Sequence, residues 1–384
     1  MTTGVAVVGT GESEEIGAVP RKSAMQMHAE AAANALENAN LSLTDVDALL
    51  TCGVDFMPSL MVAEYLGLKP KYSSSNSIGG SSFVAHVHEA TRAIQCGECD
   101  VALITHGETR RSNRKRGVPA RPTHDDPWLP DWQWERIYGV QFPPAAYALA
   151  ATRHMFEYGT TSEQFAEIAV ATRSWATLNP MAFKRDPITI DDVLSSPWLV
   201  YPFHPLDCCL VTDAGGAIVL TSTARAGTLG VPVVEILGSS VAHTHYGISQ
   251  MPELCVTPAA QTGAEAFRQA GLTPADIDVA QLYDSFTYTV LVTLEDLGFC
   301  AKGEGGDFVS NQRTAPGGDF PLNTSGGGLS YNHPGMFGMF LMIEAVRQLR
   351  GECGQRQVPH AEVALVNAMG GYLSSAATAI LGRI

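Results

Sequence analysis

Short apolar runs alternate with longer amphipathic stretches along most of the chain. The runs at 4–9, 45–50 and 100–105 are typical of strands, because each is short and rich in aliphatic residues. The stretches at 24–39 and 84–97 are typical of helices: the first is rich in alanine without glycine or proline, and the second repeats apolar residues at helical spacing. This alternation predicts mostly parallel sheets covered by helices.

The segment at 73–80 consists almost entirely of small and polar residues. We therefore expect a tight turn that opens directly into the helix at 84–97. The segment at 110–147 is rich in proline, tryptophan and charged residues and has little periodicity, which predicts an inserted loop region.

Helical patterns at 162–179 and 190–194 precede a strand at 217–221, and a new apolar strand begins at Val231. The boundary between two halves is expected near 224–230. The sequence thus predicts an N-terminal half at 1–225, with an inserted region at about 110–200, and a C-terminal half at 226–384.

The second half repeats the pattern of the first. Residues 35–47 align without a gap to 266–278, at a constant offset of 231, and two further pairs of segments match: 89–92 with 344–347, and 100–104 with 362–366. Duplication explains this better than chance. In a duplicated α/β unit the carboxyl ends of strands from both halves meet, so the site is expected to draw on both.

Charge and length exclude several classes of protein. The 384 residues are enough for two or three compact units, and the net charge of −15 repels phosphate backbones and anionic membranes. We therefore expect neither a nucleic-acid partner nor a membrane partner. Without a long apolar run or a basic, apolar leader at 1–17, the sequence predicts a cytoplasmic protein.

The eight cysteines are too sparse for a disulfide framework, and Cys208 and Cys209 are adjacent. Cys96 and Cys99 have the spacing of half a zinc site, but no second pair follows at ligand spacing. We expect reduced thiols, no metal, and a helix-end turn at 96–99.

Several motifs resemble those of the thiolase superfamily. They are Gly9-Thr-Gly-Glu12, Cys208-Cys-Leu-Val-Thr-Asp-Ala-Gly-Gly216, Tyr283-Asp-Ser-Phe286, Leu294-Glu-Asp-Leu-Gly298 and Asn323-Thr-Ser-Gly-Gly-Gly-Leu-Ser-Tyr-Asn-His-Pro334. The resemblance implies an α/β fold of duplicated βαβαβ halves in five αβαβα layers. Within the superfamily the chain most resembles the sterol-carrier-protein thiolases, also called lipid-transfer proteins, and their aldolase branch without catalytic cysteines.

Both thiols that a thiolase would use are missing. The family mechanism needs a thiolate at a helix N-terminus and a second cysteine with a histidine. Here the resemblance places Gly80 at the first position, and Ala368-Met-Gly-Gly371 replaces the pattern of the second cysteine. An acyl-enzyme therefore cannot form in the usual way.

Two tyrosines occupy motif positions beside a histidine. Tyr283 and Tyr331 lie in family motifs, and His333 follows Tyr331 by two residues. A phenol is a poor base in water, but a cation or a hydrogen bond to the phenolate lowers its pKa. By resemblance, one tyrosine is the base, the other protonates the carbanion, and His333 with main-chain donors near Gly79 and Gly80 stabilises the enolate; the sequence does not separate the two tyrosines. Without the motif context each would be an ordinary core residue.

Further residues are expected to bind substrate, although turn or capping roles are the plain alternative. They are Gly79, Gly80, Ser81, Asn332, His245, Tyr246 and Gly370. The basic run from Arg110 to Arg116 is either a contact for coenzyme A phosphates or a solvated loop.

The resemblance implies retro-aldol cleavage of a bulky β-hydroxyacyl-CoA of steroid side-chain type, giving a ketone and a short acyl-CoA such as propionyl-CoA or acetyl-CoA. No cofactor is expected, because coenzyme A is part of the substrate. A homodimer is implied, as is a small DUF35 protein with an OB-fold that completes a heterotetramer. Two alternatives are a non-catalytic acyl-CoA-binding scaffold and a cysteine-independent acyltransferase that uses Ser81 or Ser82.

Overall fold

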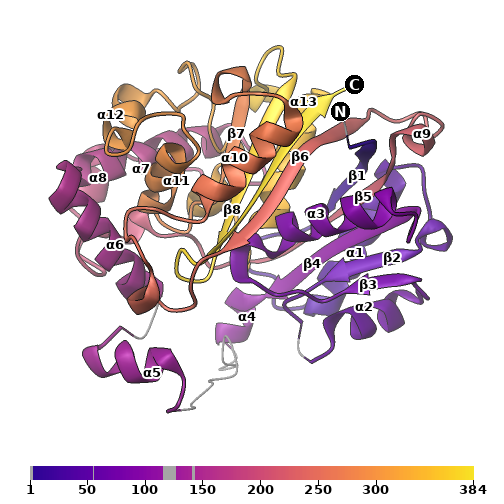
Figure 1. Ribbon diagram of the computed structural model, residues 1–384, viewed down its shortest axis with the longest axis horizontal. Helices are drawn as coiled ribbons and strands as arrows, with labels where there is room; N and C mark the ends of the chain where they lie inside the picture. Colours follow the sequence, from indigo (N-terminus) through magenta and orange to yellow (C-terminus); the bar gives the residue numbers. More distant parts are fainter. Residues whose placement is uncertain (1–2, 55, 116–126, 141–142) are drawn as a thin grey trace.

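The computed structural model describes residues 3–54, 56–115, 127–140 and 143–384 (Figure 1). Its strands are β1 (Val5–Glu12), β2 (Ala48–Thr51), β3 (Tyr72–Ser74), β4 (Val101–Thr109), β5 (Asp213–Ser222), β6 (Val234–His243), β7 (Val279–Leu282), β8 (Val363–Gly370) and β9 (Ser375–Arg383). Its α-helices are α1 (Ala24–Asn38), α2 (Pro58–Leu66), α3 (Ser82–Gln95), α4 (Arg110–Lys115), α5 (Pro130–Trp134), α6 (Pro143–Tyr158), α7 (Ser162–Thr177), α8 (Ile190–Leu194), α9 (Thr223–Ala226), α10 (Ala259–Ala270), α11 (Thr287–Asp296), α12 (Gly305–Val309) and α13 (Gly338–Arg350).

The strands form one mixed sheet in the order β3-β2-β4-β5-β1-β6-β9-β8-β7. Only β2–β3, β2–β4 and β7–β8 are parallel pairs, and the other neighbours are antiparallel. The expectation of mostly parallel sheets is therefore wrong. For β8 and β9 the reason is the connection: residues 371–374 are too few for the crossover that parallel strands require.

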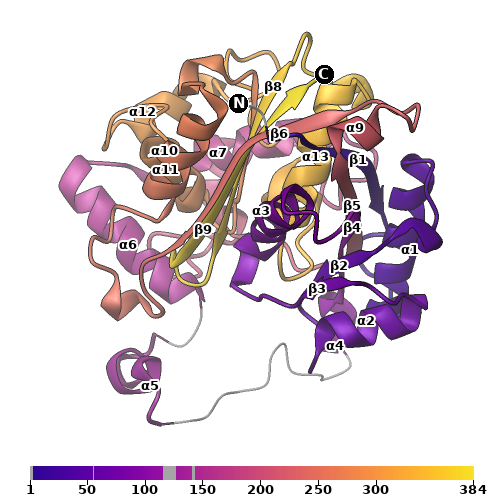
Figure 2. The ribbon, with the colours of Figure 1, turned by 45° about the vertical axis from the view of Figure 1, so that its right-hand side comes forward.

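The two halves of the sheet enclose a central layer of helices. β1 and β6 join the halves through two residue pairs, Ala6 with Glu235 and Val7 with Val234. Figure 2 shows α3 and α13 between the halves, with α1 on the outer face of one half and α10 on the outer face of the other. This is the five-layered α/β arrangement that the resemblance implies.

The duplication is visible in individual hydrogen bonds. The Asp47 carboxylate accepts the N–H groups of Asp100 (3.0 Å) and Val101 (2.8 Å), which ties the start of β4 to that of β2. In the second half, the Asp278 carboxylate accepts those of Glu362 (2.8 Å) and Val363 (2.9 Å) at the starts of β7 and β8. The repeated sequence therefore encodes the same hydrogen bonds between neighbouring strands in both halves.

The region between β4 and β5 is more helical than its composition predicts. It begins with α4 and includes α5 and α6, although low periodicity favoured a loop over 110–147. α7 begins with a capping box, in which the Thr161 hydroxyl accepts the Gln164 N–H while the Gln164 side chain accepts that of Thr161. In the described part of the chain, no helix has the length and apolar character needed to span a bilayer.

Candidate active site

The Tyr283 side chain lies directly over Gly80. Tyr283 follows β7, whereas Gly80 lies in the turn at Gly79–Ser81 that leads into α3. A Cβ atom added at Gly80 would come within 3.0 Å of Tyr283 Cζ and Oη and of the Met369 carbonyl oxygen. The phenol therefore fills the space into which a nucleophilic side chain at Gly80 would project.

Tyr283 and His333 form a hydrogen-bonded pair. Tyr283 Oη lies 2.9 Å from His333 Nε2, and the Phe337 N–H donates to the same phenol oxygen at 3.2 Å. The pair is nearly buried, with 4% of Tyr283 and 9% of His333 exposed. Tyr283 comes from the end of β7 and His333 from the loop before α13, so two distant segments of the second half meet at the start of α3 from the first half.

The protonation states of this pair, called the relay below, would allow it to pass a proton. Burial, together with the nearby Arg110 charge, lowers the pKa of His333 to about 4. Burial raises the pKa of Tyr283 well above its ordinary value. At neutral pH the imidazole is therefore neutral and the phenol protonated. With the imidazole proton on Nδ1, the phenol donates to Nε2 and its oxygen accepts the Phe337 N–H.

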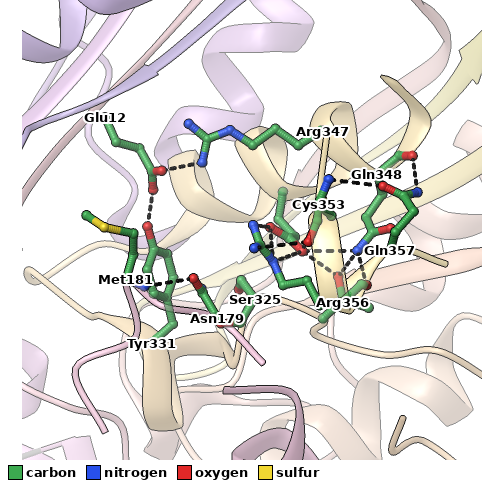
Figure 3. A network of polar contacts seen from close by, with 12 residues as sticks. Glu12, Asn179, Met181, Ser325, Tyr331, Arg347, Gln348, Cys353, Arg356 and Gln357 are labelled. Carbon is green, nitrogen blue, oxygen red and sulfur yellow. Dashed lines mark hydrogen bonds and ion pairs between the residues drawn. The ribbon is translucent and has the colours of Figure 1, made fainter. Parts of the chain in front are cut away.

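The other motif tyrosine points elsewhere. The Tyr331 hydroxyl donates to the Glu12 carboxylate, which also pairs with Arg347 of α13 (Figure 3). Burial and the Glu12 charge raise the pKa of Tyr331 well above its ordinary value. The hydroxyls of Tyr283 and Tyr331 therefore have different hydrogen-bond partners, His333 and the partly buried Glu12, and a catalytic role for Tyr331 stays a prediction.

Three of the expected glycines pack around the relay. Gly79 has a φ of +74°, and a Cβ there would meet Gly371 N within 3.0 Å. A Cβ at Gly370 would meet the Ile78 carbonyl oxygen and the Ser81 hydroxyl just as closely. Gly79, Gly80 and Gly370 therefore allow the backbone of the β8 end to approach the turn before α3.

The serines at this turn have structural partners. The buried Ser81 hydroxyl lies 3.0 Å from the Ile78 carbonyl oxygen and 2.8 Å from the Ser375 hydroxyl, and Ser82 donates to the Gly79 carbonyl oxygen at 2.6 Å. Within the described residues, no imidazole or carboxylate contacts either hydroxyl. A serine nucleophile needs such a base, so the geometry contradicts the acyltransferase alternative.

Asn332 is fully buried, and neither atom of its amide has a hydrogen-bond partner among the described residues. An unpaired buried amide is costly, so a bound water or ligand would be stabilised there. Its assignment to substrate binding stays a prediction.

His245 and Tyr246 lie beyond the end of β6, against the turn between β8 and β9. His245 Nε2 lies 3.0 Å from the Tyr372 carbonyl oxygen, and the Tyr246 side chain is 62% exposed. No hydrogen bond joins either residue to Tyr283 or His333, so their place in an acyl pocket also stays a prediction.

None of the cysteines near the relay has the character of a nucleophile. Burial raises the pKa of Cys209, an electrostatic neighbour of Tyr283, to about 12, and it does the same for Cys52. Both are therefore neutral thiols at physiological pH. Cys96 is the C-cap of α3 and is followed by Gly97 at a φ of +72°, which is the expected helix-end turn.

The described part of the basic run begins beside the relay and reaches exposed residues. Arg110 pairs with Glu108 at 3.1 Å, and the pair packs against Gly335, two residues after His333. Arg111 lies over the Phe183 ring, Arg114 and Lys115 are exposed, and Arg116 lies outside the described residues. A role in binding phosphate stays a prediction.

Sequence reasoning missed several groups that support the relay. They are the Phe337 N–H, the Thr212 hydroxyl that accepts the His333 N–H at 2.9 Å, Asp284, and Tyr147, which donates to the Gly371 carbonyl oxygen at 3.1 Å. Asp284 and Thr212 lie inside the family motifs quoted from the sequence, so their positions could have indicated that they belong to the site. No sequence signal marks Phe337 or Tyr147. Phe337 acts through a main-chain N–H, which almost every residue has, and Tyr147 lies in a helix of the inserted region, outside the family motifs.

Comparisons with known proteins identify the family of this chain. A family model described as "Thiolase C-terminal domain-like" matches residues 240–383. The chain is 36% identical over 346 residues to "Steroid side-chain-cleaving aldolase" from Thermomonospora curvata, covering 86% of each protein. It is 38% identical over 341 residues to "17-hydroxy-3-oxo-4-pregnene-20-carboxyl-CoA lyase" from Mycobacterium tuberculosis, covering 86% of this chain and 87% of that protein.

A solved structure, "Ltp2-ChsH2(DUF35) aldolase", superposes with a TM-score of 0.88 at 33% identity and covers 100% of this chain and 98% of that one. The similarity extends over both halves of the sheet and the helices between them. The arrangement of layers described above is therefore shared with this structure.

Proposed function

Because the chain belongs to the thiolase superfamily, in the family that contains the side-chain-cleaving aldolases, we propose that it is a lyase that cleaves a β-hydroxyacyl-CoA by retro-aldol chemistry. The bond between the α and β carbons breaks. The products are a ketone and a shorter acyl-CoA.

The observation that carries this proposal is the phenol over Gly80. A thiolase that loses its nucleophile but keeps a thioester site can still stabilise an enolate. Tyr283 supplies an acid/base group at that place, in contact with a neutral imidazole. Acid/base groups of this kind accelerate proton transfer by about a hundredfold to ten-thousandfold.

The geometry supports a relay mechanism. The β-hydroxyl of the substrate gives its proton to Tyr283 Oη while the phenol proton moves to His333 Nε2, 2.9 Å away. The β-oxygen becomes a carbonyl, the α–β bond breaks, and its electron pair forms the thioester enolate. The imidazolium then returns the proton through Tyr283 to the α carbon, which restores both groups.

Main-chain donors are expected to stabilise the enolate oxygen. Gly80, in the turn that leads into α3, lies against Tyr283, close to the helix end that carries a partial positive charge. This geometry favours Tyr283 over Tyr331 as the base, a choice that the sequence left open.

For the substrate we propose a steroid-type β-hydroxyacyl-CoA, with propionyl-CoA or acetyl-CoA as the acyl product. The two named relatives support this class, since one is called a steroid side-chain-cleaving aldolase and the other a lyase of a pregnene-carboxyl-CoA. No cofactor enters the mechanism, because every proton transfer uses side chains of this chain. The exposed Arg114 and Lys115 remain our candidates for the coenzyme A phosphates.

We also propose two kinds of partner. The name of the superposed structure includes a DUF35 protein, which supports a complex with a small OB-fold subunit and, with two copies of each chain, a heterotetramer. A homodimer is supported by the position of β3 at the sheet edge and by Leu60, Met61 and Tyr65, which α2 exposes beside it. Open edges and apolar patches of this kind are typically covered.

A cytoplasmic location remains part of the proposal. All eight cysteines are free thiols, the state that a reducing compartment maintains.

The test is product formation by the protein and by Tyr283→Phe, each with its DUF35 partner and a steroid-type β-hydroxyacyl-CoA. We expect ketone release by the wild type and a loss of about a hundredfold or more in kcat for the variant, with the fold retained. Equal rates would refute the role of Tyr283. If the wild type binds the thioester without releasing ketone, the chain is instead a non-catalytic acyl-CoA-binding subunit.

A further inference from the structure

Asp284 is a buried carboxylate that the relay itself does not use. It is fully buried immediately after Tyr283, at the end of β7. Its Oδ1 accepts the Gly328 N–H at 2.7 Å, and its Oδ2 accepts the Leu329 N–H at 3.1 Å. Both donors belong to the π-helical turn at Gly327–Tyr331, two residues before His333.

The turn is shaped to receive this carboxylate. A Cβ at Gly327 would come within 3.0 Å of Asp284 Oδ2. At Gly328 it would lie 3.0 Å from Asp284 Oδ1 and 3.2 Å from His333 Cδ2. The two glycines therefore leave the space that the carboxylate occupies, on the side of the turn that faces the imidazole.

Two consecutive residues thus hold the same loop in different ways. Tyr283 contacts the His333 side chain, and Asp284 holds the main chain a few residues earlier. We infer that Asp284 is a positioning residue that fixes the His333 loop relative to Tyr283. This inference rests on the proposed function, because it assigns Asp284 to the geometry of the proposed relay.

The surroundings of Asp284 make this anchor sensitive to pH. Burial raises its pKa to about 7, against the effect of the hydrogen bonds from Gly328 and Leu329. The titratable or charged groups around it are Tyr283 on its own segment, the Cys209 thiol, His333, and Arg173 of α7, which donates to Ser330 in the turn. As pH falls through 7 the carboxylate takes up a proton, and its bonds to the two N–H groups weaken.

The test compares Asp284→Asn with Asp278→Asn. Asp278 also accepts two main-chain N–H groups, but at the opposite end of β7 from the relay. We expect Asp284→Asn to lower kcat by about a hundredfold, as misplacement of a catalytic group does, with KM changed less than about threefold. Asp278→Asn should leave kcat within about threefold of the wild type.

Two further readouts separate positioning from a general loss of structure. The kcat of the wild type should decline as pH falls through about 7, and Asp284→Asn should lack this decline. By hydrogen-exchange mass spectrometry, segment 326–334 should exchange faster in Asp284→Asn but not in Asp278→Asn. Unchanged exchange, or an unchanged pH profile, would overturn the inference.

The exchange measurement also keeps the two proposals apart. If the wild type shows no carbon–carbon cleavage, the proposed function fails, but faster exchange over 326–334 in Asp284→Asn still supports the anchoring role. If the wild type is active and the variant matches it in both rate and exchange, only the role of Asp284 fails.

Discussion

A phenol in place of a thiol changes which steps a thioester site can perform. A thiolate attacks the acyl carbon, whereas a protonated phenol paired with a neutral imidazole only moves protons. Tyr283 and Gly80 are sterically linked, because a side chain at Gly80 and the phenol compete for one space. At the scale of single residues, this exclusion is what favours a lyase over an acyltransferase.

Gly80→Ala should therefore inactivate the site without adding any reactive group. The new methyl would displace the phenol from its position beside His333, and we expect kcat to fall by about a hundredfold. Gly227→Ala is the control, since a Cβ there meets nothing closer than 3.7 Å. Steady-state kinetics check this prediction, and a Gly80→Ala enzyme as active as the control would contradict it.

The sequence predicted part of this residue-scale picture. Motif spacing placed Gly80, Tyr283 and His333 in one site because each lies in a family motif. It did not predict the partner of Tyr331, since Glu12 lies 319 residues away along the chain and no local pattern encodes such a contact. The Phe337 N–H was equally hidden, because every residue but proline carries that donor.

The elements explain why Tyr331 has an ionic partner. Its hydroxyl, Glu12 at the end of β1 and Arg347 in α13 connect the first strand of one half to a central helix of the other (Figure 3). Of these three residues, Tyr331 lies two positions before His333 in the same loop. At this scale Tyr331 acts as a tie between elements.

Tyr331→Phe should accordingly have a clear effect on the free energy of unfolding and only a small effect on kcat. Loss of the hydroxyl leaves Glu12 paired with Arg347, so we expect the free energy of unfolding to fall by about 1–2 kcal/mol. We expect kcat to fall much less than for Tyr283→Phe. Urea unfolding and kinetics on both variants check this, and a larger loss of kcat for Tyr331→Phe would show that Tyr331 is the base.

The predicted helices and strands were mostly correct, with errors in the strand directions and in the inserted region. Helices α7 and α8 were expected because capped, amphipathic segments are encoded locally. α6 was missed because it begins with two prolines and is rich in alanine, which weakens its periodic signal. β5 pairs antiparallel with β1 and β4 because of the place and direction in which the chain returns to the sheet. The local pattern of apolar and polar residues does not determine that direction.

Buried histidines make the stability of the whole molecule depend on pH. Burial lowers the pKa values of His28, His86 and His333 to about 3, 4 and 4. Each folded-state pKa lies below the unfolded value of about 6.5. The unfolded chain therefore binds more protons between these values, and this contribution to stability is lost as pH falls from about 6.5 toward 4.

His28→Gln isolates one of these contributions. His28 lies away from the relay, with Nδ1 3.0 Å from the Thr105 hydroxyl. Between pH 6.5 and pH 4 we expect the wild type to lose about 3 kcal/mol more unfolding free energy than the variant. This pH interval lies between the unfolded and folded pKa values of His28, where each pH unit changes the free energy by up to about 1.36 kcal/mol. Chemical denaturation at the two pH values measures the difference, and parallel losses would contradict it.

The most direct measurement follows the fate of the substrate in deuterated water without free coenzyme A. The protein, together with the proposed DUF35 partner, is given a steroid-type β-hydroxyacyl-CoA, and the products are quantified by mass spectrometry. Cleavage through Tyr283 and His333 predicts ketone and short acyl-CoA in equal amounts, with one solvent deuterium on the α carbon. Tyr283→Phe should form these products about a hundredfold or more slowly. A requirement for free coenzyme A, or an acyl group attached to the protein, would contradict the account.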